Sequence, residues 1–248
     1  SSSGDFAWRL AGDRVNIVHR LTPATISDSR LVQGLGELVE ARVLSGQGGF
    51  EAAAVAVVSS VAADPAAAWF AFYANSLAEL SDGRSAFAPI HARALDLLAG
   101  DEVLEVGCCF GFFAVRCAQS GHRVHACDLT AGAVSLLDQV APRLGVEVQA
   151  VCGDARVLPF GDGAVDTVTL IHLLEHLDAD DVEATLTEAF RVARRRVVVA
   201  VPFEDEPTEH YGHLQRLSED DLHRWAALVP QARSEIFTDH GGWLILDR

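Results

Sequence analysis

Residues 103–111 read Val-Leu-Glu-Val-Gly-Cys-Cys-Phe-Gly, an apolar run that leads into a turn containing two glycines. The pattern predicts a buried strand that ends before Gly107 and a helix that begins at about Gly111. Glycine in such a turn lacks the side chain that would keep a ligand away from the backbone. Asp128 follows at the end of the next predicted strand. Together these residues predict a site for a cofactor that contains a nucleoside.

The turn itself indicates which nucleoside cofactor fits. A dinucleotide-binding turn needs glycine at its first, third and sixth positions, and here Cys109 and Phe112 occupy the third and sixth. Nicotinamide and flavin cofactors are therefore disfavoured. S-adenosylmethionine has no phosphate to hold, and Glu105, Gly107 and Gly111 supply the acidic strand end and the glycines that it needs. In these residues the chain resembles class I S-adenosylmethionine-dependent methyltransferases, except that the family usually has glycine at Cys109, where a side chain can crowd the cofactor.

Strand and helix patterns alternate from residue 102 onward. Strands are predicted at 102–106, 123–127, 147–151, 165–171, 195–201, 235–238 and 243–246, and helices at 111–119, 131–142, 178–193 and after Ser218. Such alternation predicts an α/β fold in which a parallel sheet has helices on both faces. The resemblance implies a Rossmann-like, mostly parallel seven-stranded sheet whose last strands include an antiparallel one.

The first hundred residues have a different pattern. Two strand-like runs at 7–10 and 15–20 flank an Ala-Gly-Asp turn and predict a hairpin. Helices are then predicted at 28–44, 49–62, 65–80 and 88–99. We therefore expect an N-terminal hairpin and helical cap over residues 1–87, followed by an S-adenosylmethionine-binding methyltransferase domain over residues 88–248.

Residues at strand ends are expected to bind the cofactor, because ligands of open parallel sheets lie beyond the carboxyl ends of the strands. Asp128 lies 21 residues after Gly107, which is the usual spacing of an acid that accepts from both ribose hydroxyls; its alternative role is to cap the helix near Ala131. By the resemblance, Asp154 accepts from the adenine amino group beside the small Ala155, although Asp154 also suits a plain turn. The expected cofactor-binding residues are Glu105, Gly107, Cys109, Gly111, Asp128, Leu129, Asp154 and Ala155.

Three potential metal ligands follow the fourth predicted strand of this half, in His172-Leu-Leu-Glu175-His176. One interpretation is structural, because Glu-His after this strand is common in methyltransferases. A second is the His-x-x-Glu-His motif of an inverted zinc peptidase, which requires both histidines on one face of a helix. That interpretation ranks last, since the motif ends a strand here.

The third interpretation is a metal site. The segment resembles that of metal-dependent O-methyltransferases, including small-RNA 2'-O-methyltransferases and ubiquinone-pathway enzymes, in which Glu-x-x-Glu-His holds a divalent cation. Glu175 and His176 match, and His172 replaces the first glutamate. In the RNA enzymes another histidine ligand lies five residues before a Ser or Thr that starts a helix, as His213 lies before Ser218. The expected metal ligands are therefore His172, Glu175, His176 and His213.

These imidazoles and one carboxylate suit Mn, Fe, Co or Zn better than the harder Mg. A cation would lower the pKa of a substrate hydroxyl and orient it toward the methyl group. The expected catalytic residues are His172, His176, His213 and His210, because His210 or an unligated member of the cluster can take the proton. Without a metal, His172, His176 or His213 becomes the general base.

The composition bears on partners. Net charge is -16, from 35 acidic against 19 basic residues, and every basic residue is arginine. Nucleic acid is therefore disfavoured as a partner, and a small or neutral hydroxylated substrate is favoured. The Arg194–Arg196 cluster, beside Arg191, is interpreted as cations at a helix C-terminus. No long apolar stretch, signal peptide or Cys-x-x-Cys pair is present, so we expect a cytoplasmic protein without membrane insertion or disulfides.

Longer motifs extend the resemblance over nearly the whole chain. They are Glu-Val-Gly-Cys-Cys-Phe-Gly-Phe at 105–112, His-Leu-Leu-Glu-His-Leu at 172–177, Arg-Arg-Arg-Val-Val-Val-Ala-Val-Pro-Phe-Glu-Asp-Glu-Pro at 194–207 and Tyr-Gly-His at 211–213. In these the chain resembles mycofactocin oligosaccharide methyltransferases, which implies O-methylation of a glucose unit. The alternatives are a metal-independent small-molecule O-methyltransferase with a histidine base and a catalytically inactive S-adenosylmethionine-binding module. The oligomeric state is left open.

Overall fold

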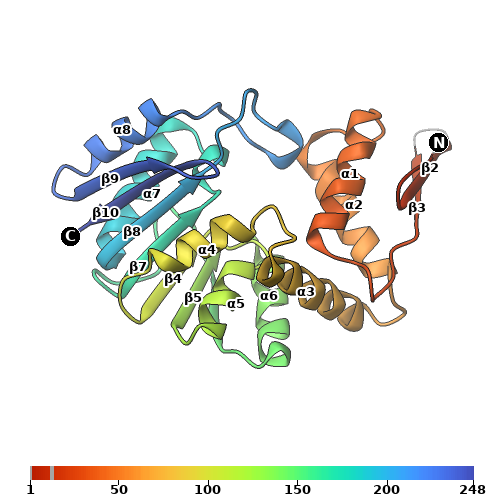
Figure 1. Ribbon diagram of the computed structural model, residues 1–248, viewed down its shortest axis with the longest axis horizontal. Coiled ribbons are helices and arrows are strands. Elements are labelled where there is room, and N and C mark those ends of the chain that lie inside the picture. Colours follow the sequence, from red (N-terminus) through yellow and green to blue (C-terminus); the bar gives the residue numbers. More distant parts are fainter. Residues whose placement is uncertain (1, 12–13) are drawn as a thin grey trace. The chain divides into compact units, whose positions relative to one another are not determined.

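The computed structural model describes residues 2–11 and 14–248 (Figure 1). The chain divides into two compact units, each described by itself below. The first contains residues 1–88 together with 208–212, and the second contains 89–207 and 213–248. The first unit is thus built from two separate stretches of sequence. The expected boundary between residues 87 and 88 stays a prediction of domain organisation.

The first unit begins with a small antiparallel sheet in the order β1-β2-β3. Its strands are β1 (Ser2–Ser3), β2 (Phe6–Ala11) and β3 (Arg14–His19). The hairpin predicted from the sequence corresponds to β2 and β3, and residues 12–13 of its turn lie outside the described residues.

Three helices follow in this unit: α1 (Asp28–Glu40), α2 (Gly46–Ser60) and α3 (Pro65–Asp82). The Ser27 and Asp64 side chains accept from backbone N–H groups at the starts of α1 and α3, where N-terminal donors lack partners within the helix. The prediction that the first helix reaches residue 44 is wrong. It ends at Glu40, because the backbone turns there and the N–H groups of Val43 and Leu44 donate back to Leu38.

A short return segment completes the first unit. The 3-10 turn η3 (Glu209–Tyr211) packs against α2. The Phe50 ring, which is 8% exposed, lies 5.4 Å from the rings of both His210 and Tyr211. Gly212 has a φ of +82°, and a Cβ there would lie 2.4 Å from the Gln47 side chain. The left-handed backbone, which glycine adopts without strain, makes glycine the residue that fits at position 212.

The second unit is built around a seven-stranded sheet in the order β6-β5-β4-β7-β8-β10-β9. The strands are β4 (Glu102–Val106), β5 (Arg123–Asp128), β6 (Val148–Cys152), β7 (Val165–Ile171), β8 (Ala193–Val201), β9 (Arg233–Thr238) and β10 (Gly242–Asp247). The first five are parallel, and β10 runs antiparallel to both β8 and β9. The predicted mostly parallel seven-stranded fold is confirmed.

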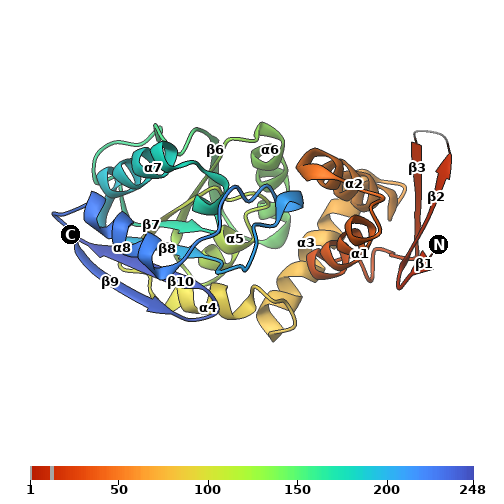
Figure 2. The ribbon, with the colours of Figure 1, turned by 90° about the horizontal axis from the view of Figure 1, so that it is seen from above.

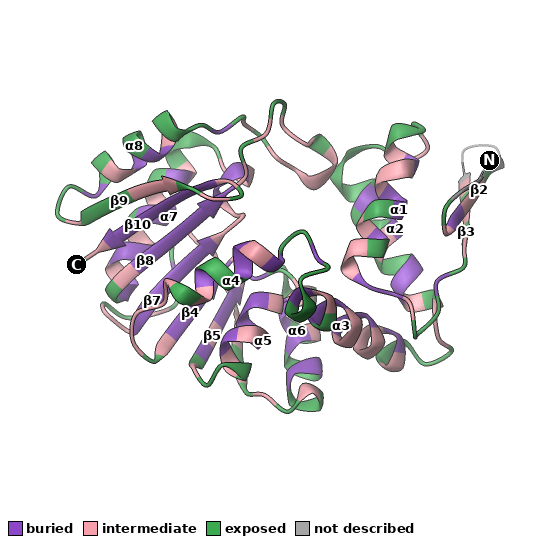
Figure 3. Ribbon diagram, viewed as in Figure 1, coloured by how far each residue is buried: buried purple, intermediate pink, exposed green. Residues whose placement is uncertain are grey.

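Helices cover both faces of this sheet, with α4 on one face and α7 on the other (Figures 1 and 2). The helices of the unit are α4 (Ala88–Asp96), α5 (Phe112–Gln119), α6 (Ala131–Val140), α7 (Ala179–Val192) and α8 (Glu219–Leu228). The central strands are buried on both sides, as Figure 3 shows for β8 and β10. Apolar residues run without interruption from Val197 to Val201 of β8, which is typical of a parallel strand covered on two faces.

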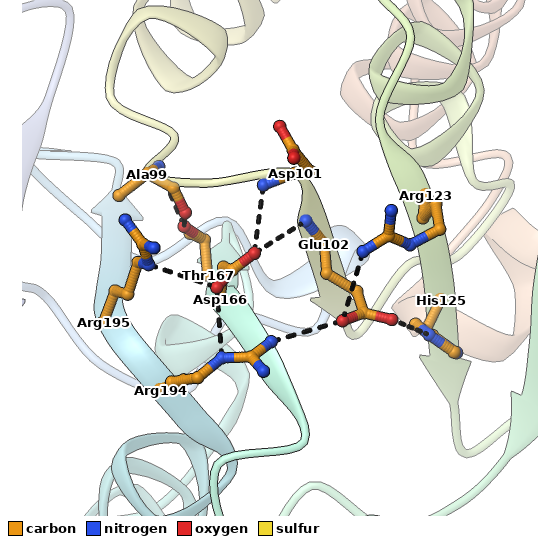
Figure 4. Close-up of polar contacts among 9 residues, drawn as sticks. All are labelled: Ala99, Asp101, Glu102, Arg123, His125, Asp166, Thr167, Arg194 and Arg195. Atoms are coloured by element: carbon orange, nitrogen blue, oxygen red, sulfur yellow. Dashed lines mark hydrogen bonds and ion pairs between the residues drawn. The ribbon is translucent and has the colours of Figure 1, made fainter.

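Asp166 anchors the amino-terminal edge of the sheet (Figure 4). Its carboxylate accepts from the backbone N–H groups of Asp101 and Glu102, at 3.0 and 3.2 Å, and pairs with Arg194 and Arg195. Two backbone N–H groups and Arg194 hold the pKa of Asp166 below its usual value despite its desolvation, which acts in the opposite direction.

The interpretation of the arginine cluster as cations at a helix terminus is wrong for three of its members. Arg194 and Arg195 extend from β8 to Asp166, and Arg196 pairs with Asp247 of β10 at 2.6 Å. The helix α7 ends at Val192, so these arginines lie beyond it and join neighbouring strands. Arg191, in the last turn of α7, pairs with Glu188 and Asp162.

Within the described residues, no single helix is both long enough and apolar enough to cross a bilayer. The pair α2 and α3, bent by 106°, meets the requirement only when both are counted together.

Candidate active site

The turn after β4 is folded back onto the end of β5. The N–H groups of Gly107 and Cys108 both donate to the Cys127 carbonyl, at 2.8 and 3.1 Å, and Gly111 N–H donates to the Cys108 carbonyl at 2.6 Å. Gly107, Cys109 and Gly111 have φ of 72°, 48° and 70°. Glycine adopts this region without strain, whereas Cys109 does not. The tight turn therefore depends on the glycines at both of its ends.

The two glycines of the turn also make room for leucine side chains. A Cβ at Gly107 would lie 2.7 Å from Leu173, and one at Gly111 would lie 2.5 Å from Leu137. Part of the space that we assigned to ligand approach is thus filled by the protein itself. The contact with Leu173 has a second consequence, because it joins the turn to the His172–His176 segment.

Glu105 lies behind the turn. It is 6% exposed, and its Oε2 accepts from the N–H of Ala114 in the first turn of α5 at 2.8 Å. Burial raises the pKa of Glu105 to about 8, against the lowering effect of that hydrogen bond. In this structure Glu105 fixes the start of α5, and its predicted contact with the cofactor stays a prediction.

Asp128 ends β5 with both carboxylate oxygens engaged by backbone groups. Its Oδ2 accepts from the N–H of Cys109 at 2.7 Å, and its Oδ1 accepts from the N–H of Thr130 at 2.8 Å. The N-cap residue of α6 is Thr130 and not Asp128. The side chain of the adjoining Leu129 is 71% exposed. A half-buried carboxylate held in place beside an exposed apolar side chain fits recognition of a ribose and its base.

Asp154 follows β6 and is paired with an arginine that the sequence analysis did not consider. Arg156 contacts it with Nε at 2.9 Å and Nη2 at 2.6 Å, and also reaches Asp181. These hydrogen bonds hold the pKa of Asp154 below its usual value. The half-buried Ala155 lies between the two paired residues in sequence. Asp154 would therefore accept from an adenine amino group only with the lone pairs that Arg156 leaves.

The His172–His176 segment leaves β7 in an irregular conformation. His172 has a φ of +52°, and its N–H donates to the Ala200 carbonyl at 2.8 Å. Glu175 and His176 lie in the 3-10 turn η2 (Leu174–His176). The inverted zinc peptidase motif needs an α-helix here, so this geometry argues against that alternative.

His213 is brought to the η2 turn by contacts from the residues that follow it. The N–H of Leu214 donates to the Glu175 carbonyl at 2.9 Å, and Gln215 Nε2 donates to the Leu177 carbonyl at 2.8 Å. The rings of His176 and His213 lie 4.9 Å apart at 82°. One potential ligand atom from each of Glu175, His176 and His213 lies within 4.8 Å of the other two.

Glu175 is the most deeply buried member of this group, with 1% exposed. Among the described residues, neither of its carboxylate oxygens has a hydrogen-bond partner. Burial raises the pKa of Glu175 to about 8, and it lowers the pKa of His172 to about 4 with help from His213 and His176. His172 Nδ1 lies 3.4 Å from Glu175 Oε1, although His172 is outside the three-residue group.

Sequence reasoning missed Glu204. Its Oε2 lies 2.7 Å from Nδ1 of His213, whose side chain is 8% exposed. The local sequence Glu204-Asp-Glu206 offers several equivalent acids, and no spacing rule singles one out. Gln215 was missed because its contact with the Leu177 carbonyl is made only in the folded chain, and Arg156 was missed although its partner Asp154 is only two residues away.

The structure does not group His210 with these residues. It belongs to the first unit, where its ring packs against Phe50 and Tyr211 at 5.4 and 4.2 Å. Its proposed role as a base stays a prediction.

Comparison with known proteins extends these observations. Residues 104–201 match the family model described as a methyltransferase domain. Demethylmenaquinone methyltransferase from Corynebacterium glutamicum is 33% identical over 100 residues, which is 40% of this chain and 40% of that protein. The chain thus aligns with about 40% of the length of the curated relatives that it matches.

Two solved structures have similar folds. A putative S-adenosyl-L-methionine-dependent methyltransferase from Methanococcus maripaludis has a TM-score of 0.54 and 13% identity, covering 69% of this chain and 90% of that one. A structure described as SAM-dependent methyltransferases from Methanosarcina mazei has a TM-score of 0.51 and 17% identity, covering 63% and 96%. Residues 104–201 therefore match a methyltransferase domain, and they lie within a unit that has the fold of class I S-adenosylmethionine-dependent methyltransferases.

Proposed function

We propose that the protein is an S-adenosylmethionine-dependent O-methyltransferase that acts on a sugar hydroxyl. The domain match and the fold support the use of this methyl donor. S-adenosylmethionine supplies an electrophilic methyl group on a sulfonium centre. Asp128, held by two backbone N–H groups, would bind its ribose hydroxyls, and Leu129 and Ala155 would contact its adenine.

A divalent cation at Glu175, His176 and His213 is the second part of the proposal, with His172 beside it. One observation carries this part: a carboxylate that is 1% exposed has no hydrogen-bond partner among the described residues and faces two imidazoles. A buried carboxylate without a hydrogen-bond partner is costly, and a cation would offset that cost. The donor set therefore fits a borderline metal such as Mn, Fe, Co or Zn.

A bound cation would act as a Lewis acid that lowers the pKa of a substrate hydroxyl. The residues of the site would supply the rest. The packing of Leu173 against Gly107 keeps the histidine segment next to the cofactor turn. Burial lowers the pKa of His172 to about 4, so its imidazole is neutral at pH 7 and is a weaker base than an ordinary histidine.

The acceptor that we propose is a glucose unit of the mycofactocin oligosaccharide. The sequence motifs quoted above support it, as does a net charge of -16, which disfavours polyanionic substrates. Demethylmenaquinone, named in the relatives, belongs in the same assay as a second acceptor.

Calorimetry with S-adenosylmethionine tests the cofactor site. Asp128→Asn should weaken binding by about 10- to 100-fold, since a hydrogen bond to a charged group contributes about 1.5–3 kcal/mol. Asp138→Asn, on the exposed face of α6, is the matched control and should bind as the wild type does. Equal affinities of the wild type and Asp128→Asn for S-adenosylmethionine would contradict the proposal that Asp128 binds the ribose.

Elemental analysis and methyl transfer test the metal. Purified protein should contain a divalent metal, and chelation should abolish transfer to the oligosaccharide until Mn²⁺, Co²⁺ or Zn²⁺ is restored. His213→Ala should lose metal and turnover together while still binding S-adenosylmethionine. Full activity of metal-free protein would reject the metal and favour the histidine-base alternative. Cofactor binding without transfer to any hydroxylated acceptor would favour an inactive binding module.

A further inference from the structure

Glu204 and His213 lie in one long connection, on either side of residues 208–212. The strand β8 ends at Val201, and α8 begins at Glu219. Between them the chain leaves the second unit for residues 208–212 and re-enters it at His213. The contact of 2.7 Å between Glu204 and His213 thus joins the departing and returning parts of the connection within the second unit.

This contact fixes the chemistry of the imidazole as well as its position. A carboxylate can only accept hydrogen bonds, so Nδ1 of His213 carries the proton that is shared with Glu204. The other ring nitrogen, Nε2, then carries no proton and has a lone pair in the plane of the ring. Histidines that ligate metals commonly donate their second ring N–H to a carboxylate in this way.

We infer that Glu204 is a positioning residue, which holds His213 in the Nδ1-protonated tautomer with Nε2 available to the cation. The inference rests on the metal site of the proposed function. Burial favours it, because the His213 side chain is 8% exposed and solvent has little access to replace Glu204 as its partner. Glu204 itself is 26% exposed and needs no direct contact with substrate or metal.

Cobalt binding by Glu204→Ala tests the inference, because Co²⁺ reports on its ligands through visible absorption without any need for turnover. Removing such a carboxylate typically weakens metal affinity by about 10- to 100-fold. Glu204→Ala should show that loss, and Glu204→Gln, whose amide oxygen can still accept from Nδ1, should recover part of it. Glu206→Ala is the matched control, since Glu206 is an exposed acid two residues away, and it should bind Co²⁺ as the wild type does.

Nitrogen-15 spectra of the metal-free proteins give an independent measurement. Wild type should show His213 protonated on Nδ1, and Glu204→Ala should shift it toward the Nε2-protonated form. Unchanged Co²⁺ affinity and an unchanged tautomer in Glu204→Ala would overturn the inference and leave the metal site standing. Failure of the wild type to bind Co²⁺ would reject the metal site of the proposed function instead. The nitrogen-15 spectra would then decide by themselves whether Glu204 sets the tautomer of His213. If Glu204→Ala does not fold, Glu204→Leu, which keeps the bulk of the side chain and removes the acceptor, replaces it in both measurements, and wild-type behaviour in both would overturn the inference.

Discussion

Glu105 shows how one buried carboxylate affects stability. Burial raises its pKa to about 8 in the folded protein, above the usual value of 4.5. The folded state then binds more protons than the unfolded state between these two values. The stabilising contribution of the protonated group is complete below pH 4.5 and is lost as the pH rises through about 8.

Replacing Glu105 with glutamine should therefore raise the melting temperature more at pH 8.5 than at pH 5.5. The glutamine side-chain oxygen can still accept the hydrogen bond from the N–H of Ala114. Because glutamine is never ionised, its burial carries no cost of desolvating a charge at high pH. Thermal unfolding at the two pH values measures the difference. Glu147→Gln, at an exposed position, should shift both melting temperatures equally. The explanation fails if Glu105→Gln does so too.

The candidate site was visible in the sequence only where its residues follow a local rule. Glu175 and His176 stand together after a strand, and the spacing from His213 to Ser218 pointed to the third residue that the fold brings to them. Glu204 follows no such rule, because its partner His213 is fixed by the course of the loop between β8 and α8. The roles of all these residues as ligands or bases stay predictions.

The start of α5 depends on Gly111. Its φ of +70° is strained for a residue with a side chain, and a Cβ would lie 2.5 Å from Leu137 of α6. Gly111→Ala should therefore destabilise the protein by about 2 kcal/mol or more, from strain and overpacking together. Chemical denaturation measures this loss.

Gly132, in α6, is a glycine that alanine should replace without strain. A Cβ there meets nothing within 4 Å, and its backbone is helical. Gly132→Ala should stabilise the protein by up to about 1 kcal/mol, because alanine has the higher helix propensity. Equal effects of the two alanine substitutions would contradict this account of the turn.

Element types were predicted better than element ends. Hydrophobic periodicity showed each helix and strand of the second unit, because every parallel strand contains a run of buried or half-buried apolar residues. The end of α1 at Glu40 was missed because an apolar pattern continues through Val43 and Leu44 after the backbone has turned. The role of Arg194–Arg196 was missed because their acidic partners are distant in sequence.

Phe50 is expected to hold the return segment in the first unit. Phe50→Ala should destabilise that unit by about 3 kcal/mol, in the range for a buried aromatic ring, and should speed amide exchange in residues 208–212. Hydrogen exchange read by mass spectrometry measures the second effect. Val55→Ala, on the same helix but with 51% of Val55 exposed, is the control and should change neither by much. Unaltered exchange in 208–212 after Phe50→Ala would show that other contacts hold the segment.

The parallel sheet with helices on both faces followed from the alternating pattern, since few topologies connect parallel strands through helices, and the seven-stranded form with an antiparallel strand followed from the resemblance. That residues 208–212 belong to the first unit, although they interrupt the sequence of the second, could not be predicted in that way. Five residues carry no periodicity, and their contacts with α2 are made across a large separation in sequence.

Because the first unit contains both residues 1–88 and residues 208–212, it cannot be completed early during synthesis on the ribosome. When residue 88 has emerged, the first unit still lacks the rings of His210 and Tyr211 that cover Phe50, and these arrive about 120 residues later. The apolar surface of the N-terminal helices therefore stays partly exposed while most of the large sheet is translated. A fragment that stops before residue 208 should expose Phe50 to water. A chaperone that binds exposed apolar surface should therefore bind such a fragment at the helices α1, α2 and α3.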